Sequence, residues 1–182
     1  MIHPFPLYLL RHGETEWNRQ GRLQGRLDSP LTVQGRKQAE QQAATLAGIT
    51  APGYASPQGR AQDTARIILG PDFITDPRLV EIDVGDFTGA RLDDLHRDHP
   101  GLFHDWLGWY DQTPNGEHFA ALAVRCRAFL DDLTGPAVVV THGVTLRMLR
   151  VLALGQGVAK LGDLPLRQGQ VYHVEGGQHR AL

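Results

Sequence analysis

The chain has 182 residues, of which 41% are hydrophobic and 21% are charged, and its net charge at pH 7 is −2. This length and composition are typical of a globular protein with one substantial core, so we expect residues 1–182 to form a single domain. The small net charge and the lack of a long Lys or Arg run argue against nucleic acid and anionic membranes as partners. No apolar run is long enough to cross a bilayer, and the N-terminus lacks the basic and apolar segments of a secretory signal. The single cysteine excludes an intrachain disulfide framework, as expected in a reducing compartment, so we expect a cytoplasmic protein.

Apolar runs and helical periodicity alternate along the chain. The predicted strands are residues 6–10, 54–56, 73–74, 138–140 and 170–174, with the last strand at an edge of the sheet. The predicted helices are residues 33–47, 59–69, 90–99, 102–110, 119–133 and 144–154. Strands that alternate with helices are typical of an α/β fold with a mostly parallel sheet.

Two polar segments interrupt this alternation. Residues 14–30 form a long loop rich in Arg, Gln and Gly, and a loop of this length inside a compact domain is more often functional than not. Residues 79–89 contain two glycines and three acids and are predicted to be a second loop. Trp106 and Trp109 are expected to pack inside the fold. Cys126 lies on the apolar stripe of its helix, which predicts a buried side chain and not a reactive thiol.

Two of the predicted strands end in a histidine followed by a glycine: His12 follows the first strand and His142 follows the fourth. The carboxyl ends of parallel strands meet at one edge of a sheet, where ligand crevices lie, so we expect both imidazoles to face one pocket. Arg11 adds a planar cation suited to phosphate or carboxylate. Gly13 has no side chain and allows a ligand or another loop to approach the backbone closely. An imidazole in this place can act as a nucleophile, a base or a hydrogen-bond donor.

A series of sequence blocks surrounds these two histidines. The blocks are Arg11-His12-Gly13-Glu14-Thr15 with Asn18, Arg22 and Gly25; Asp28-Ser29-Pro30-Leu31-Thr32 with Gly35; Ser56-Pro57-Gln58-Gly59-Arg60-Ala61 with Thr64-Ala65; Leu79-Val80-Glu81-Ile82 with Gly85 and Gly89; and Thr141-His142-Gly143. In their order and content they resemble the signature of the histidine phosphatase superfamily, and they span most of the chain. The resemblance implies a phosphoglycerate-mutase-like fold, which is a three-layer α/β domain with a mostly parallel central sheet and helices on both faces.

The resemblance also implies a role for each of five residues. His12 would attack a phosphomonoester and form a phosphohistidine that water hydrolyses. The attacking imidazole must be neutral, and the cations of Arg11 and Arg60 favour that form. Arg11, Arg60 and His142 would hold the transferring phosphoryl group, and Glu81 would protonate the leaving alkoxide. Two guanidiniums and an imidazole supply the positive charge, so neither a metal ion nor a cofactor is implied.

Five further residues are predicted to contact the substrate: Asn18, Gln24, Gly25, Gly143 and Glu117. Glu117 is also a rival proton donor, because it ends a proline–x–glycine–glutamate block that resembles small phosphatases of the superfamily; we place Glu81 ahead of it. Taken singly, each candidate has an ordinary structural interpretation as a surface charge, a core histidine, a loop acid or a turn residue. Taken jointly, in order and at strand ends, they favour a catalytic site.

The sequence departs from the family pattern in two places. Pro57-Gln58-Gly59 precede Arg60 where the family usually has a more helical pair, which either shifts Arg60 or alters only the turn. Val144 stands after Gly143 where a second glycine is frequent, and it narrows the space near that backbone.

Residues 79–89 resemble the phosphatase branch of the superfamily, of the α-ribazole phosphatase and fructose-2,6-bisphosphatase kind, more than the mutases. Mutases carry additional insertions, for which the chain has little room between Gly89 and Pro114. We therefore predict a metal-independent phosphomonoester hydrolase that acts on a small phosphorylated metabolite. The alternative is a 2,3-bisphosphoglycerate-dependent phosphoglycerate mutase, and a third hypothesis is a module that binds phosphate groups without turnover. The sequence leaves both a monomer and a dimer open.

Overall fold

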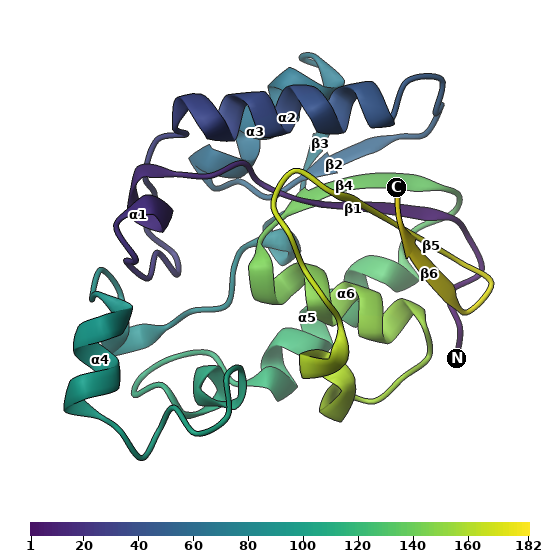
Figure 1. The fold of residues 1–182 in the computed structure, drawn as a ribbon. Helices are drawn as coiled ribbons and strands as arrows, with labels where there is room; N and C mark the ends of the chain where they lie inside the picture. The colour runs from purple at the N-terminus through teal and green to yellow at the C-terminus, as the bar shows by residue number, and fades with distance from the viewer.

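The computed structural model describes residues 1–182 and shows an α/β domain in three layers (Figure 1). Its strands are β1 (Leu7–Arg11), β2 (Gly53–Ala55), β3 (Ile74–Thr75), β4 (Ala137–Thr141), β5 (Val171–Glu175) and β6 (Gln178–Ala181). Its helices are α1 (Glu16–Arg19), α2 (Val33–Thr45), α3 (Gly59–Leu69), α4 (Leu92–Asp98), α5 (Phe119–Asp131) and α6 (Gly143–Ala153). None of these helices has the length and apolar character needed to cross a bilayer.

The sheet has the strand order β3-β2-β4-β1-β5-β6. The first four strands of the chain run parallel, whereas β5 is antiparallel to β1 and β6 is antiparallel to β5. Helices α2 and α3 cover one face, and α5 and α6 cover the other (Figure 1). The predicted fold class, an α/β domain with a mostly parallel central sheet between two helical layers, is confirmed.

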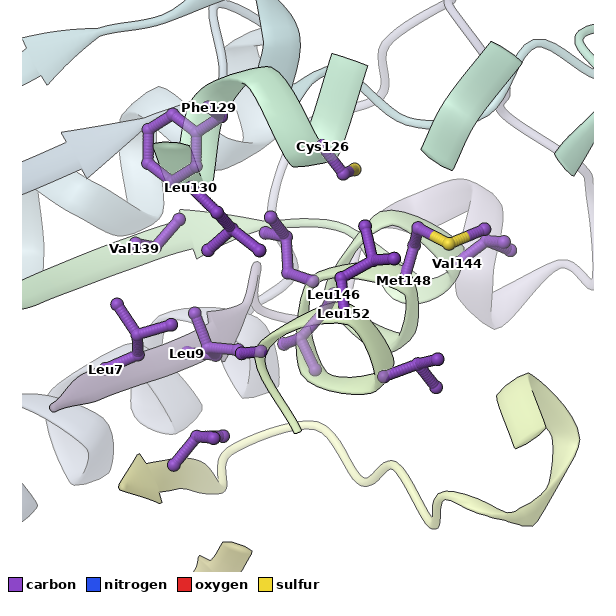
Figure 2. Packing of buried hydrophobic residues seen from close by; sticks show 14 of the residues in the cluster. Leu7, Leu9, Cys126, Phe129, Leu130, Val139, Val144, Leu146, Met148 and Leu152 are labelled. Carbon is purple, nitrogen blue, oxygen red and sulfur yellow. The ribbon is translucent and has the colours of Figure 1, made fainter. Parts of the chain in front are cut away.

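Strands β1 and β4 are neighbours at the centre of the sheet, with Leu7 opposite Ala137 and Arg11 opposite Thr141. Side chains alternate between the two faces of a strand. Leu7 and Leu9 therefore join the core formed with α5 and α6 (Figure 2), while Leu10 joins the core beneath α2 and α3. Because helices cover both faces, these strands are apolar throughout and become polar only where they end.

Gly13 lets helix α2 approach the end of β1. A Cβ atom at Gly13 would lie 2.2 Å from the backbone oxygen of Gly35 in the first turn of α2. Thr32 starts this helix, because its hydroxyl accepts a hydrogen bond from the backbone N–H of Gly35 at 2.9 Å. We expected either a ligand or another loop to approach Gly13 closely, and the segment that does so is the start of α2. This contact places α2 beside Glu14.

Three local predictions were wrong. The 170–174 strand is not an edge strand, because β6 pairs with β5 outside it. The segment 102–110 is not a helix: only a 3-10 turn at Gly108–Gln112 forms there, and before it the Asp105 carboxylate accepts the backbone N–H of Leu107. Trp106 is 57% exposed and stacks on the Arg147 guanidinium at 4.9 Å, although Trp109 is buried as expected.

Other local predictions were confirmed or refined. Cys126 of α5 is fully buried in the core that α5 and α6 form against the sheet (Figure 2), and burial raises the pKa of its thiol to about 12. The loop after β1 contains the short helix α1, which begins with a capping box between Thr15 and Asn18. The 79–89 segment is a loop with a 3-10 turn at Gly85–Phe87.

Candidate active site

The adjacent ends of β1 and β4 bring His12 and His142 together, as the sequence predicts. The two ring centroids lie 5.2 Å apart, and the backbone N–H of His12 donates to the carbonyl oxygen of Thr141 at 2.9 Å. Both imidazoles are buried, with 2% of His12 and none of His142 exposed. His142 is also the residue from which α6 starts.

Two hydrogen bonds fix the protonation state of His12. Its Nδ1 lies 2.8 Å from the carbonyl oxygen of Gly13, and a carbonyl can only accept, so Nδ1 carries the hydrogen. Its Nε2 then has the lone pair, and this lone pair accepts a hydrogen bond from Nε of Arg60 at 3.2 Å. Burial, followed by the charges of Arg60 and Arg11, holds the pKa of His12 well below its usual value of 6.5. His12 is therefore a neutral imidazole with a nucleophilic Nε2.

Arg60 and Arg11 are held in different ways. Arg60 is 2% exposed and donates to four protein acceptors: Nε2 of His12, the Leu27 carbonyl at 2.6 Å, the Asp28 carboxylate at 2.9 Å and the Gly25 carbonyl at 3.0 Å. The Nε atom of Arg11 is buried without a hydrogen-bond partner in the protein. Burial lowers the pKa of both guanidiniums, although both remain cations. Arg11 therefore has N–H groups that are free to donate to a ligand. Arg60 is already held in place by its protein acceptors.

Asp28 holds Arg60 in place together with His12, which Arg60 also contacts. The sequence did not predict this role for Asp28. One carboxylate oxygen accepts the backbone N–H of Gly59, and the other accepts the backbone N–H and Nη1 of Arg60 at 3.1 and 2.9 Å. Asp28 therefore caps the start of α3 from a distant loop and also neutralises the arginine. The unusual residues 57–59 alter only the turn, because Arg60 still reaches His12.

His142 has one satisfied nitrogen and one free nitrogen. Its Nε2 lies 2.7 Å from the hydroxyl of Ser56, and that hydroxyl accepts the backbone N–H of Gln58 at 3.3 Å. We assign the Ser56 hydroxyl as the donor to Nε2, which leaves the hydrogen of the neutral ring on Nδ1. Nδ1 is buried without a partner in the protein. Burial, and then the charge of Arg60, holds the pKa of His142 well below 6.5. Its Nδ1–H is a donor available to a bound anion.

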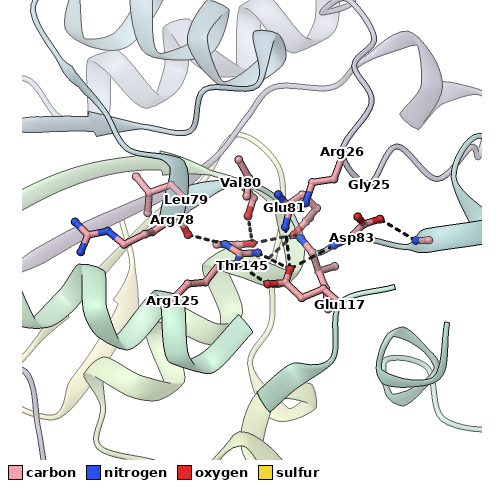
Figure 3. Close-up of polar contacts among 12 residues, drawn as sticks. Gly25, Arg26, Arg78, Leu79, Val80, Glu81, Asp83, Glu117, Arg125 and Thr145 are labelled. Atoms are coloured by element: carbon pink, nitrogen blue, oxygen red, sulfur yellow. Dashed lines mark hydrogen bonds and ion pairs between the residues drawn. The ribbon is translucent and has the colours of Figure 1, made fainter. Parts of the chain in front are cut away.

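Glu81 is held at the start of helix α6, as Figure 3 shows for its contact with Thr145. Its Oε1 accepts the backbone N–H groups of Ile82 and Thr145 at 2.9 and 3.1 Å, whereas its Oε2 accepts only that of Val144 at 3.2 Å. Val144, where the family often has glycine, thus keeps its backbone donor and uses it to orient the acid. Oε2 has the greater remaining capacity and is the oxygen suited to carry a proton.

Glu117 has a different environment (Figure 3). It forms a two-pronged ion pair with Arg125, at 2.7 and 2.8 Å, and its Oε2 also lies 3.3 Å from Arg26. Burial alone would raise the pKa of Glu117, but the hydrogen bonds and charge of Arg125, aided by Arg26, outweigh burial and hold the pKa below its usual value. Glu117 is thus an ion-pair partner of Arg125 on α5 whose lowered pKa favours the carboxylate, which argues against a role as proton donor.

The side chains around His12 enclose a cavity of about 70 Å³. It is lined by Arg11, His12, Asn18, Arg22, Leu23, Gln24, Gly25, Arg60, Glu81, Val84 and Tyr110. Seven of the ten predicted site residues are among them. The other three are His142, which lies beside His12, Gly143, which lies next to Arg11 and Glu81, and Glu117. No group of three or more His, Cys, Asp or Glu side chains is placed to hold a metal ion.

Tyr110 is the main lining residue that sequence reasoning missed. It stacks on Trp109 with ring centroids 3.8 Å apart, and burial raises the pKa of its phenol to about 12. Residues 91–115 were expected at the rim of the pocket, but residues 102–110 were predicted to be a packed helix, and their pattern does not single out Tyr110. Gln24 was predicted, and its buried Oε1 has no partner in the protein, so it can accept a donor from a ligand.

Known proteins are similar to this chain in sequence and in fold. Residues 7–181 match the family model of the histidine phosphatase superfamily (branch 1). A probable phosphoglycerate mutase GpmB from Enterobacter sp. (strain 638) is 40% identical over 181 residues, which cover 93% of this chain and 84% of that protein.

Two solved structures with phosphatase names have the same fold. A mycobacterial glucosyl-3-phosphoglycerate phosphatase in complex with VO3 superposes with a TM-score of 0.84 at 29% identity, covering 97% of this chain and 96% of the other. A putative α-ribazole-5′-P phosphatase from Escherichia coli superposes with a TM-score of 0.82 at 26% identity, covering 98% and 95%.

These likenesses confirm the predicted family, including its α-ribazole phosphatase neighbours, and the predicted class of enzyme, a phosphoric monoester hydrolase. Because the family model matches almost the entire chain, the chain belongs to the histidine phosphatase superfamily, branch 1.

Proposed function

We propose that the protein hydrolyses small phosphomonoesters through a phosphohistidine formed at Nε2 of His12. The observation that carries this proposal is the pair of hydrogen bonds on the His12 ring, to the Gly13 carbonyl at 2.8 Å and from Arg60 at 3.2 Å. Together they present a neutral imidazole lone pair between guanidiniums, which is what attack on a phosphate group requires.

The chemistry follows from the donors around this lone pair. An entering phosphoryl group takes the hydrogen bond of Arg60 Nε away from His12, and Arg11 and the Nδ1–H of His142 provide further donors to its oxygens. His12 Nε2 attacks phosphorus, the ester P–O bond breaks, and Glu81 Oε2 gives its proton to the leaving oxygen. Glu81 then takes a proton from water, whose oxygen attacks the phosphohistidine, releases inorganic phosphate and restores neutral His12.

The test is a hydrolysis screen of the purified protein against p-nitrophenyl phosphate and a panel of phosphorylated metabolites. We expect release of inorganic phosphate that persists in EDTA, because the positive charge comes from Arg11 and Arg60 and the neutral ring of His142 adds a hydrogen-bond donor. Loss of activity in EDTA with recovery on adding a divalent metal would contradict the mechanism. Failure to hydrolyse any member of the panel would contradict the function.

The second candidate is a phosphoglycerate mutase that depends on 2,3-bisphosphoglycerate. The relative at 40% identity is named a probable phosphoglycerate mutase, and Arg22 adds a third guanidinium to the cavity lining. A mutase must exclude water from the phosphohistidine and transfer the group to a second substrate. This candidate predicts interconversion of 2- and 3-phosphoglycerate that 2,3-bisphosphoglycerate stimulates, and a null result removes it.

The proposed partner is a small phosphorylated molecule. The small cavity at His12, lined by the guanidiniums of Arg11, Arg22 and Arg60, supports this because it suits the phosphoryl group of such a molecule. The net charge of −2 supports neither nucleic acid nor a membrane surface as partner. We propose a cytoplasmic location, which a single buried thiol supports, and either a monomer or a dimer.

A further inference from the structure

Gln58 occupies the segment that departs from the family pattern, and its side chain makes two long-range hydrogen bonds. Its Oε1 accepts the backbone N–H of Glu81 at 2.7 Å. Its Nε2 donates to the carbonyl oxygen of Gly25 at 2.8 Å. Only 8% of Gln58 is exposed, so neither bond competes freely with water. One amide group therefore connects the backbone of the proton donor with a loop that lines the cavity.

The position of Gln58 in the chain frees its side chain for this purpose. Gln58 immediately precedes helix α3 but makes no capping hydrogen bond of its own, because Asp28 accepts the first backbone N–H groups of that helix. The ring of Pro57, the residue before Gln58, fixes its own backbone φ. The amide consequently points away from α3 and toward the loops that carry Gly25 and Glu81.

Both ends of this bridge reach the reacting groups. The Gly25 carbonyl also accepts Nη2 of Arg60 at 3.0 Å, and Gly25 has a φ of 48°, a left-handed backbone that the two donors hold in place. At the other end, α6 orients the Glu81 carboxylate, but the N–H of Glu81 itself is fixed by Gln58. Removing the amide leaves the partly buried N–H of Glu81 without its partner and frees the Glu81 backbone to move.

We propose that Gln58 is a positioning residue that aligns the proton donor Glu81 with the phosphate held at Gly25 and Arg60, and thereby sets activity toward esters with poor leaving groups. The inference rests on the proposed function, with Glu81 as general acid. A good leaving group departs without protonation, so misalignment of Glu81 lowers the rate of hydrolysis of its ester only slightly. A poor leaving group must be protonated as it departs, so the rate of hydrolysis of its ester falls most.

The experiment compares kcat/KM for p-nitrophenyl phosphate, phenyl phosphate and β-glycerophosphate, in order of worsening leaving group. We expect Gln58→Met to lower kcat/KM for β-glycerophosphate by about 10- to 100-fold and to affect p-nitrophenyl phosphate far less, the loss expected when a reacting group is misplaced by about 1 Å. The shorter amide of Gln58→Asn cannot span both partners, so it should give the same selective loss and serves if Gln58→Met does not fold.

Gln62→Met is the matched control. Gln62 lies one turn further along α3 and donates to the Ser56 carbonyl and the Thr75 hydroxyl, but it contacts neither Glu81 nor Gly25. We expect this variant to leave the ratio of the three rates unchanged. Gln58→Met should also cause no further selective loss in a Glu81→Gln background, because both changes remove the same proton transfer.

Equal loss on all three substrates, the same selectivity in Gln62→Met, or full additivity with Glu81→Gln would overturn the role of Gln58 while leaving the phosphatase function intact. A wild-type protein without phosphohydrolase activity would instead overturn the proposed function, and the role of Gln58 with it.

Discussion

Arg60 donates a hydrogen bond from its Nε to Nε2 of His12, the nitrogen that would attack phosphorus, at 3.2 Å. This contact protects the lone pair from protonation, since a proton on Nε2 would face the N–H of a buried cation. It also blocks the nucleophile until an anion arrives and takes the arginine donor. Burial and this side chain thus keep His12 neutral in the free enzyme, and in the proposed mechanism the same side chain would bind the phosphoryl group.

The first prediction concerns activity at acidic pH. Because burial and the charges of Arg60 and Arg11 hold the pKa of His12 well below 6.5, the nucleophile stays neutral in mildly acidic solution. The acidic limb of a plot of log kcat/KM against pH should therefore lie well below pH 6.5. Arg60→Met removes one of the two cations and should move that limb toward higher pH. A limb at 6.5 in the wild-type protein would mean that His12 titrates normally.

A second prediction concerns stability. His12 and His142 have a lowered pKa in the folded protein and an ordinary one in the unfolded chain. Between pH 6.5 and the lower folded values, the unfolded chain binds more protons. The free energy of unfolding therefore falls as the pH is lowered through this window and is unaffected by these groups above it. Thermal unfolding should show a steeper loss of Tm from about pH 7 to about pH 5 in wild type than in His12→Asn. Parallel curves would exclude His12 as a source of acid sensitivity.

The third prediction concerns Asp28. Asp28→Ala leaves the buried guanidinium of Arg60 without its carboxylate and removes the cap of α3. We expect a loss of about 1–3 kcal/mol in the free energy of unfolding, measured with denaturant. We also expect a fall in kcat/KM on every substrate, because phosphate contacts serve all of them. Asp63→Ala is the control, since Asp63 pairs with Arg66 on the exposed side of the same helix. Equal effects of the two substitutions would show that Asp28 has no special role.

The fourth prediction separates the two acids. Glu81→Gln should lower the rate of β-glycerophosphate hydrolysis by about 100- to 10,000-fold, the usual contribution of a general acid, and that of p-nitrophenyl phosphate much less. Glu117→Gln disrupts the ion pair with Arg125 and should lower Tm without changing the preference between leaving groups. If the selectivities were reversed, Glu117 would be the donor, in spite of its lowered pKa.

The sequence predicted those parts of the site that lie where an apolar strand stops. Leu7–Arg11 and Ala137–Thr141 are buried strands with a clear apolar signal, so the residues after them could be placed at one edge of the sheet. Because the two strands end side by side, the ring centroids of His12 and His142 lie 5.2 Å apart. Arg60 and Glu81 were predicted from the family motifs alone. Arg60 stands in the first turn of α3, whose apolar periodicity does not mark it, and Glu81 lies in a loop without periodicity.

The partners of these residues could not be predicted, because they depend on how distant loops fold back. Asp28, Gln58 and Ser56 are polar residues without a local pattern, and their bonds to Arg60, Glu81 and His142 span 32, 23 and 86 positions of the chain. The position of Tyr110 in the cavity lining was not predicted for the same reason. Its segment has helical spacing, but its tertiary contacts favour a 3-10 turn that faces the cavity.

The central claim is that His12 receives the phosphoryl group. The most direct measurement is rapid acid-free quenching of the protein during turnover of p-nitrophenyl phosphate, followed by mass spectrometry of its peptides under alkaline conditions that preserve phosphohistidine. We predict one phosphoryl group, on His12, that is lost in acid, and no phosphoprotein and no turnover in His12→Ala. A phosphoryl group on His142 or any other side chain, or sustained turnover by His12→Ala, would contradict this account.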